Sequence, residues 1–176
     1  MNELMPHGDV RPQQWGDSGN SCNKIVFQQE ALATCLHEAV SLLGEHYEEI
    51  AEFKHLLVLD PDYSRYEEVE KRNGLRVITA RENGRLVGYI VFFIYKHLHY
   101  KSVLVASDDI HFICKEKRAG SVGIRLFREG ERALRAAGVK FILVRCKAKH
   151  DHSRIFEHLG YRPFDIMYAK ELGDSL

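Results

Sequence analysis

The chain has 176 residues, 45% of them hydrophobic, so it is long enough for one domain with a buried core and short for two. Its 25 basic residues balance its 25 acidic ones, which leaves no strongly basic field to hold nucleic acid through its phosphates. No apolar run reaches the roughly 18 residues that a membrane span requires. We therefore expect neither a membrane nor a nucleic acid as a partner.

The first 23 residues are rich in Gly, Pro, Gln, Asn and Asp and show no apolar period. This composition is typical of a flexible tail, so we expect a tail over residues 1–23 and a single domain over residues 24–176. The tail does not have the basic and then apolar pattern of a secretory leader. The four cysteines form no Cys-x-x-Cys pair, which favours free thiols in a reducing, cytoplasmic compartment.

The domain is predicted to begin with helices. Apolar residues over residues 27–53 recur at spacings of three and four, as on one face of an amphipathic helix. A second, polar helix is expected over residues 61–71, with Asp60 as its N-cap and Asn73-Gly74 at its end.

Three strands are predicted next, over residues 75–81, 86–96 and 103–114, because these segments are rich in β-branched and aromatic side chains. Asn83-Gly84 favours a tight hairpin between the first two strands. A second connection, around residues 97–101, completes an antiparallel meander.

A basic, glycine-containing turn over residues 118–123 links the last of these strands to an amphipathic helix predicted over residues 124–137. A helix leaves its first N–H groups without partners and carries a partial positive charge at that end. Glycines near such a turn let the backbone approach a ligand closely. This arrangement favours a phosphorylated small-molecule cofactor.

The C-terminal part completes the predicted sheet. Residues 140–146 contain four consecutive large apolar side chains, which predicts a fully buried strand. A short helix is expected over residues 151–159, ending at Gly160, and a closing strand over residues 162–170. The whole pattern predicts an α/β fold with a mixed, mostly antiparallel central sheet flanked by helices.

Two stretches give the chain a resemblance to the GNAT-superfamily N-acetyltransferases. Arg118, Ser121 and Gly123 occupy the first, fourth and sixth positions of the family's cofactor loop, Arg/Gln-x-x-Gly-x-Gly/Ala. Residues 156–161 resemble the family's C-terminal Tyr-Glu-x-x-Gly-Phe. Residues 150–153, followed by Gly160-Tyr161, are similar to the ending of some phage-encoded members. The order of the predicted elements over residues 27–172 fits the same family.

The resemblance implies an enzyme that transfers an acetyl group from acetyl-CoA to a primary amine, by direct attack in a ternary complex. It implies that the main chain of Phe112, Ile113 and Cys114 pairs with the pantetheine arm as an added strand would. Lys117 and Arg125 are candidates for further phosphate contacts. The residues implied to cradle the pyrophosphate are Arg118, Ala119, Gly120, Ser121, Val122 and Gly123.

The chain departs from the family pattern at two positions. Ser121 stands where the loop has its first glycine, and it suits that position only if the backbone there does not need positive φ. Phe156 stands where many members carry the tyrosine that protonates the leaving thiolate. Tyr161, Tyr168 or water are the alternatives for that role.

Asp108, Asp109 and His111 lie at the end of a strand predicted to be central. An attacking amine must lose a proton, and a positioned carboxylate or histidine can accept it. Strand alternation places Asp109 and His111 on one face and Asp108 on the other. We expect Asp109 to be the base or to hold a water, with His111 and then Asp108 as the next candidates. The alternative is that the aspartates cap a bulge or turn and His111 is a core residue.

Histidines also cluster at His97 and His99 and at residues 150–152. Metal sites need three or four converging ligands, and Asp151 is more simply an N-cap, so we expect no metal. The tyrosines that the resemblance suggests for the acceptor side, with a surface or core role equally open, are Tyr63, Tyr66, Tyr95 and Tyr100.

The acceptor cannot be read from the sequence: a small amine, a peptide N-terminus, a protein lysine and an aminoacyl-tRNA are all open, and so is a homodimer. The alternative function is a non-catalytic acyl-CoA-binding or structural module that retained the fold. A nucleotide-phosphate binder with a doubly wound fold is disfavoured, because no strand followed by Gly-x-Gly-x-x-Gly opens the chain.

Overall fold

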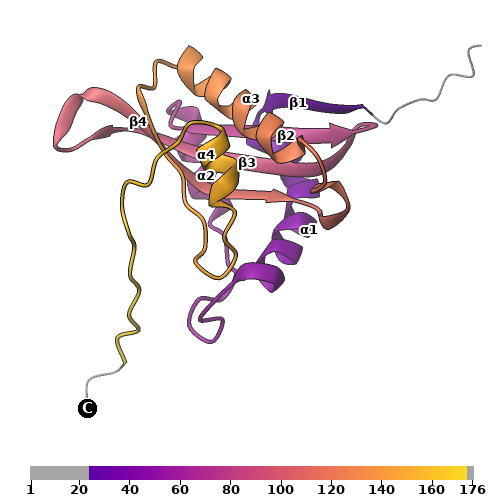
Figure 1. The fold of residues 1–176 in the computed structure, drawn as a ribbon, viewed down its shortest axis with the longest axis horizontal. Coiled ribbons are helices and arrows are strands. Elements are labelled where there is room, and N and C mark those ends of the chain that lie inside the picture. Colours follow the sequence, from indigo (N-terminus) through magenta and orange to yellow (C-terminus); the bar gives the residue numbers. More distant parts are fainter. Residues whose placement is uncertain (1–23, 174–176) are drawn as a thin grey trace, which may run out of the picture.

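The computed structural model describes residues 24–173, and the predicted tail lies outside these residues. A five-stranded sheet with the order β1-β2-β3-β4-β5 carries helices on both faces (Figure 1). The strands are β1 (Ile25–Glu30), β2 (Leu75–Glu82), β3 (Arg85–His97), β4 (Tyr100–Ile113) and β5 (Phe141–Leu143). The helices are α1 (Leu32–Ile50), α2 (Tyr63–Lys71), the 3-10 turn η1 (Lys115–Lys117), α3 (Val122–Ala136) and α4 (Ser153–His158).

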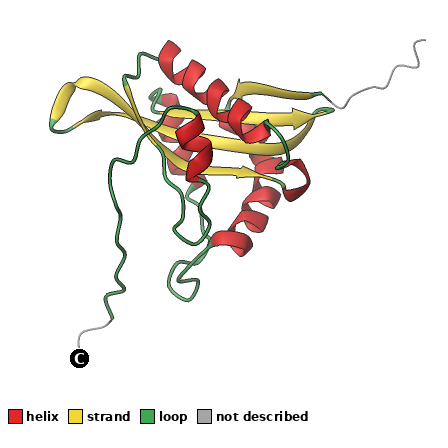
Figure 2. Ribbon diagram, in the orientation of Figure 1, coloured by secondary structure: helices red, strands yellow, loops and turns green. Residues whose placement is uncertain are grey.

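The sheet is mixed and mostly antiparallel, as predicted. Strands β1 to β4 pair antiparallel, whereas β5 runs parallel to β4. Asn83 and Gly84, with φ of 51° and 84°, form the predicted hairpin turn between β2 and β3. The long β3–β4 hairpin extends beyond the helices at one end of the molecule (Figure 2).

Alternation along the two central strands divides the core into two layers. Ile78 on β2 and Phe92 on β3 belong to the cluster that packs against α3 and α4. Val77 and Tyr89 belong to a second cluster that packs against α1 and α2. In Figure 1, α3 and α4 cover the face of the sheet toward the viewer, and α2 lies behind it. Strand β4 is thus in contact with both helical layers.

The helix predicted over residues 27–53 was wrong at its N-terminal end, because Ile25–Glu30 forms strand β1. Its side chains alternate: Ile25 and Phe27 pack against the α3 layer, while Val26 is 47% exposed. Pairing with β2 therefore outweighs the local helical spacing. Helix α1 begins only at Leu32, where the Leu32 amide donates to the Glu70 carboxylate of α2 (2.8 Å).

Two N-terminal boundaries also differ from the prediction. Asp62 rather than Asp60 caps α2, since its side chain accepts a hydrogen bond from the Arg65 amide (3.0 Å). Helix α3 begins at Val122 rather than at Ile124. After its C-cap, Ala137, Gly138 has φ 85°, the left-handed position that the sequence predicts for a C-terminal glycine.

The C-terminal part is less regular than predicted. Strand β5 has three residues and is not fully buried, since Phe141 is 41% exposed. Residues 162–170 form no strand; they extend away from the sheet (Figure 1), with Tyr168 88% exposed. A strand needs a partner edge, and a three-residue β5 offers very little of one. Within the described range, no helix is both long and apolar enough to cross a membrane.

Candidate active site

Strands β4 and β5 are paired over three residues only, and beyond them there is a gap between the two strands. Strand β5 pairs only with Val105–Ser107, and within the described part of the chain no strand pairs with the continuation of that β4 edge toward Ile113. The Cys114 amide donates to the carbonyl of Val87 on β3, so alternation directs the backbone of Phe112 to β3 as well. The backbone groups of His111 and Ile113 face the gap instead. Of the three residues implied to pair with an extended ligand, Ile113 alone presents its main chain there.

The turn before α3 has unused hydrogen-bond donors. Among the described residues, the amides of residues 119–124 have no hydrogen-bond acceptor, and Ser121 makes no side-chain cap. Gly120 has φ 76°, whereas Ser121 has φ −103°. The left-handed position thus falls on the glycine, and serine fits the position after it. A row of free amides at a helix N-terminus fits an anionic group such as a pyrophosphate.

The basic side chains at this turn are already engaged. Arg118 donates to both carboxylate oxygens of Glu49 on α1 (2.6 and 2.7 Å), and its Nε donates to the Ile113 carbonyl (2.8 Å). This guanidinium holds the pKa of the Glu49 carboxyl below its usual value. Lys117 pairs with Glu82 (2.7 Å), and Arg125 lies over the Phe27 ring.

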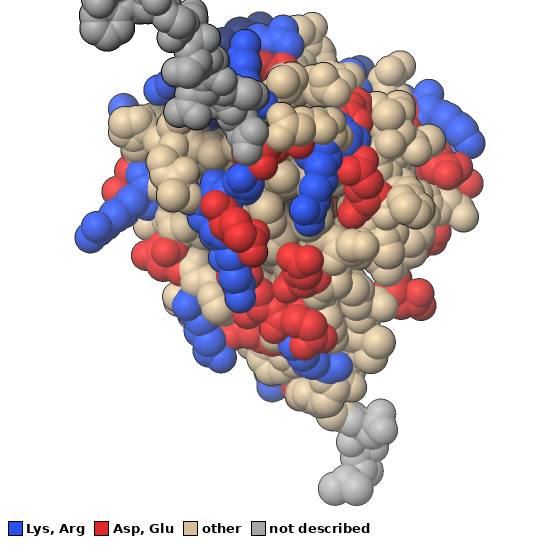
Figure 3. All heavy atoms as spheres, turned by 90° about the vertical axis from the view of Figure 1, so that its right-hand side faces the viewer, with Lys and Arg blue, Asp and Glu red and all other residues tan. Residues whose placement is uncertain are grey.

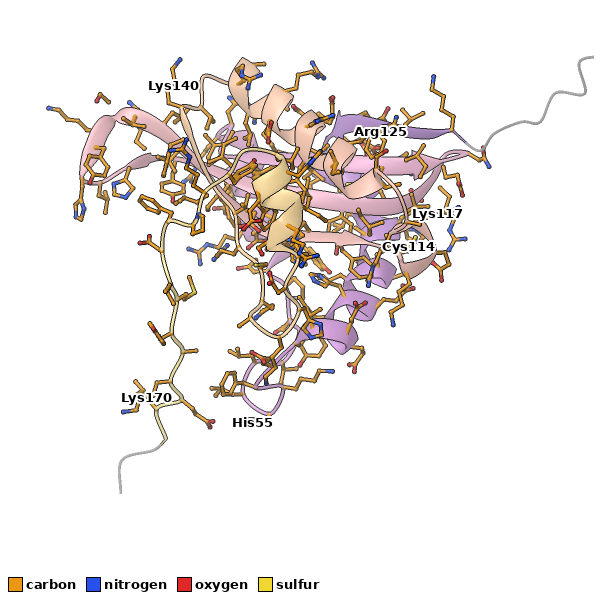
Figure 4. The ribbon with its side chains drawn as sticks, viewed as in Figure 1. His55, Cys114, Lys117, Arg125, Lys140 and Lys170 are labelled. Carbon is orange, nitrogen blue, oxygen red and sulfur yellow. The ribbon has the colours of Figure 1, made fainter. Side chains whose placement is uncertain are left out.

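Figure 4 shows Cys114, Lys117 and Arg125 at the same end of the sheet. On the face seen in Figure 3, Lys and Arg side chains alternate with Asp and Glu rather than forming one basic patch. An anion at the turn would therefore be bound mainly by backbone amides. The Arg118 guanidinium could contribute only if it also bound the anion while paired with Glu49 or left Glu49.

A bulge in β4 changes the predicted arrangement of the candidate catalytic residues. Val91 on β3 pairs with Ile110 and Phe92 pairs with Asp108, so Asp109 is an extra residue between them. The prediction that Asp109 and His111 share a face was wrong, because the bulge shifts the alternation. Asp108 and His111 lie together on the α3/α4 face, and Asp109 points to the α1/α2 face.

On the α1/α2 face, Asp109 accepts a hydrogen bond from the Tyr66 hydroxyl (2.5 Å). Burial and the Asp109 carboxylate raise the pKa of Tyr66, so this phenol remains a donor. Tyr66 stacks on Phe93 with ring centroids 5.6 Å apart. Nearby in the same layer, the Tyr89 side chain is 4% exposed, and its hydroxyl has no partner among the described residues. Asp109 thus has the Tyr66 phenol as a hydrogen-bond donor, and that phenol is held by its stacking on Phe93.

On the α3/α4 face, His111 connects two other groups. Its Nδ1 lies 3.1 Å from Asp108 Oδ2, and its Nε2 lies 2.8 Å from Nε2 of His152, just before α4. Asp108 is 2% exposed and also accepts from the Arg145 guanidinium, which follows β5. The contact between His152 and His111 could not be predicted from the sequence pattern, since the two residues are 41 positions apart.

Phe156 lies beneath these histidines. It is 7% exposed, and its ring centroid is 5.2 Å from that of His152 and 5.2 Å from that of Phe127 on α3. Tyr161 packs against Phe156, whereas Tyr168 is exposed and far along the C-terminal segment. Asp151 accepts from the Ser153 amide at the start of α4 (2.9 Å). Nowhere in residues 24–173 do three or more His, Cys, Asp or Glu side chains converge as metal ligands.

No family model matches the chain, and no curated protein does so either. Solved structures do match. The aminoglycoside acetyltransferase meta-AAC0020 from an uncultured soil metagenomic sample, in complex with trehalose, is 13% identical with a TM-score of 0.66, and the match covers 86% of this chain and 98% of that one. The same protein has been solved with sisomicin, with a TM-score of 0.65.

Two further solved structures match a similar share of the chain. A predicted acetyltransferase from Clostridium acetobutylicum with acetyl-CoA is 9% identical, with a TM-score of 0.66 over 84% of this chain and 96% of that one. A transcriptional regulator from Bacillus halodurans is 18% identical, with a TM-score of 0.67 over 85% of this chain and 100% of that one. The chain therefore has the GNAT-type acyl-CoA N-acyltransferase fold, which confirms the expected fold class.

Proposed function

We propose that this protein is an N-acetyltransferase that uses acetyl-CoA and acetylates a primary amine in a ternary complex. The observation that carries the proposal is the continuity of two features within residues 24–173: a β4 edge that no described strand pairs with and, after it, a row of amides over residues 119–124 that have no acceptor there. Together they offer an extended ligand a strand partner and then an anion site. The acetyl-CoA complex of the Clostridium protein with the same fold supports this ligand.

The residues that would hold acetyl-CoA are the turn amides, for the pyrophosphate, and the Ile113 and His111 main chain, for the pantetheine arm. When bound, this group supplies a thioester whose acetyl carbon is open to attack by an amine. The gap closes where Ser107 pairs with Leu143, so its closed end lies beside Asp108 and the bulge. The reacting end of the ligand would therefore lie near the candidate catalytic residues.

Asp109 is the first candidate for the base, with His111 and Asp108 next. Its carboxylate faces the aromatic side chains of the α1/α2 layer, and the Tyr66 hydroxyl fixes its orientation. A cationic acceptor entering from that face would be attracted by the carboxylate, which can accept the proton that the attacking nitrogen releases. The aminoglycoside sisomicin, bound to meta-AAC0020, supports an amine acceptor of this general kind.

The second candidate function is a non-catalytic acyl-CoA-binding module, and a protein named as a transcriptional regulator is among those with the same fold. A GNAT-type fold alone does not distinguish binding from catalysis.

The decisive experiment has two stages. Calorimetry compares acetyl-CoA with ATP, and thiol release is then measured with a panel of primary amines that includes sisomicin. We expect binding of acetyl-CoA in preference to ATP, and thiol release with at least one amine. Equal or preferred binding of ATP would refute the acyl-CoA site, and tight acetyl-CoA binding without thiol release would favour the binding module.

A substitution at the turn tests the site itself. Ser121→Asp keeps a residue that is as favourable as serine at an N-cap and adds a favourable helix dipole interaction, so α3 should not be destabilised. The added carboxylate should repel a pyrophosphate and weaken acetyl-CoA binding by about tenfold or more, since 1.4 kcal/mol corresponds to a factor of ten. Ser121→Ala is the neutral control, and equal affinities for the two variants would place the cofactor elsewhere.

A further inference from the structure

Three hydrogen bonds join a row of groups on the α3/α4 face, which we call the proton chain. They connect Asp108 to His111 (3.1 Å), His111 to His152 (2.8 Å), and Nδ1 of His152 to the His150 carbonyl (2.9 Å). A carbonyl can only accept, so Nδ1 of His152 carries a proton.

Each of the three bonds needs one proton, whereas two neutral imidazole rings bring only two. The proton chain therefore holds one proton more than two neutral histidines and an ionised carboxylate supply. This conclusion is independent of where along the row the extra proton resides.

The proton chain lies at the closed end of the gap between β4 and β5. Asp108 directly follows Ser107, the last β4 residue paired with β5, and the main chain of His111 lines the gap. Asp108 is 2% exposed, and the His111 side chain is 19% exposed. A mobile proton is thus kept at the place where the reacting end of an extended ligand would arrive.

The charged groups around the chain come from three elements. Strand β4 contributes Asp108 and, on its other face, Asp109; α1 contributes His46; the segment before α4 contributes Arg145 and Asp151. Helices α3 and α4 present the Phe127 and Phe156 rings. Burial lowers the pKa of His152 below its usual value.

We propose that the proton chain is the acid of the acetyl transfer and that His111 donates the proton to the leaving sulfur. This inference rests on the proposed function. As the amine nitrogen bonds to the acetyl carbon, the carbon–sulfur bond breaks and its electron pair stays on sulfur. The proton between His111 Nε2 and His152 leaves that hydrogen bond and goes to the sulfur, and Asp109 receives one proton from the attacking nitrogen. His152 supports His111 as a positioning residue. Asp109 then gives its proton to solvent water, and the proton chain takes one up from the same solvent.

The first test uses ¹⁵N spectra of the histidine rings in the full-length protein. We expect a protonated Nδ1 on His152 and one proton shared between the two Nε2 atoms. Coenzyme A should perturb both ring signals, whereas desulfo-coenzyme A, which lacks the thiol, should not. An unprotonated Nδ1 on His152, or the same response to both ligands, would overturn the proposal.

The second test uses His111→Gln and His152→Gln, with the exposed His158→Gln as the matched control. Calorimetry should show unchanged acetyl-CoA affinity in all three. Thiol release with the best amine of the panel should fall about 10²–10⁴-fold for His111→Gln and less for His152→Gln, with a changed pH profile in both. The control should behave as the original protein does.

The two proposals fail in distinguishable ways. Absence of acetyl-CoA binding in the original protein would refute the proposed function. Intact binding and turnover, with an unaltered rate and pH profile in the His111 variant, would refute the acid role alone.

Discussion

Gly120 explains how the turn before α3 tolerates a serine at the next position. The left-handed backbone, with φ 76°, falls on Gly120, and Ser121 takes an ordinary conformation. Gly123 is not required by packing, because an added Cβ would meet Ile113 and Ile155 only at ordinary contact distances of 3.6 and 3.7 Å. In this turn the backbone conformation favours glycine at position 120, whereas Gly123 is not required by conformation or by packing.

His46 makes the stability of the protein sensitive to mildly acidic pH. It is 8% exposed and stacks on Phe112 with ring centroids 5.0 Å apart. Burial, and then the charge of His111, lower the pKa of His46 from 6.5 to about 4. The unfolded chain takes up a proton near pH 6.5 and the folded one only near pH 4, so stability falls as the pH drops through this window.

The expected loss from His46 is about 3 kcal/mol between pH 6.5 and 4, at about 1.36 kcal/mol per pH unit. His46→Phe keeps the aromatic packing and removes the titration. Chemical denaturation of both proteins at pH 7 and pH 4.5 measures the difference. An equal loss of unfolding free energy in the two proteins would show that His46 is not responsible.

The face of the sheet to which Asp109 points could not be predicted from the sequence pattern. The sequence placed Asp108, Asp109 and His111 at a strand end, and the structure has them there. Strict alternation nevertheless failed, because one inserted residue changes the face of every residue beyond it. Whether a strand contains a bulge depends on its pairing with β3, and no local composition encodes that register. The contact between His111 and His152 is equally invisible in the sequence.

Helix α3 contains a glycine whose role becomes clear only from packing. A Cβ at Gly130 would lie 2.8 Å from the ring of Phe92, which is fully buried. Helix propensity alone predicts a gain of about 1 kcal/mol for Gly130→Ala. Overpacking costs about 1–3 kcal/mol, so we expect a net loss of stability.

Gly44 in α1 provides the matched control, because a Cβ there would meet nothing within 4 Å. Gly44→Ala should therefore raise the free energy of unfolding by up to about 1 kcal/mol. Thermal unfolding of both variants checks the pair. Stabilisation by alanine at both sites would mean that Phe92 moves aside at little cost.

At the level of elements, the meander, the glycine turn and α3 could be predicted, since strong local patterns agree with the tertiary contacts. Strand β1 could not, because its partner β2 lies about 50 residues further along and overrides a helical spacing. The segment after α4 alternates like a strand and yet forms none, because β5 leaves it little edge to pair with. Pairing partners, rather than propensity, account for both differences.

For the whole molecule, the segment after Gly160 is expected to be the first described part that a protease removes. Phe164, Met167 and Tyr168 are 67%, 77% and 88% exposed, and their backbone makes no strand ladder. Brief digestion with chymotrypsin, followed by mass spectrometry, should show cleavage after these residues before any cut in residues 25–160. Early cuts inside the sheet, with this segment intact, would contradict the expectation.

The short pairing between β4 and β5 has a consequence for handling the protein. A strand edge with unpaired N–H and C=O groups can pair with a strand of another chain, and such edges promote aggregation. A ligand lying along residues 108–113 would occupy that template and bind only the native state. Saturating coenzyme A should therefore slow precipitation of concentrated samples, and light scattering with and without it gives a direct readout.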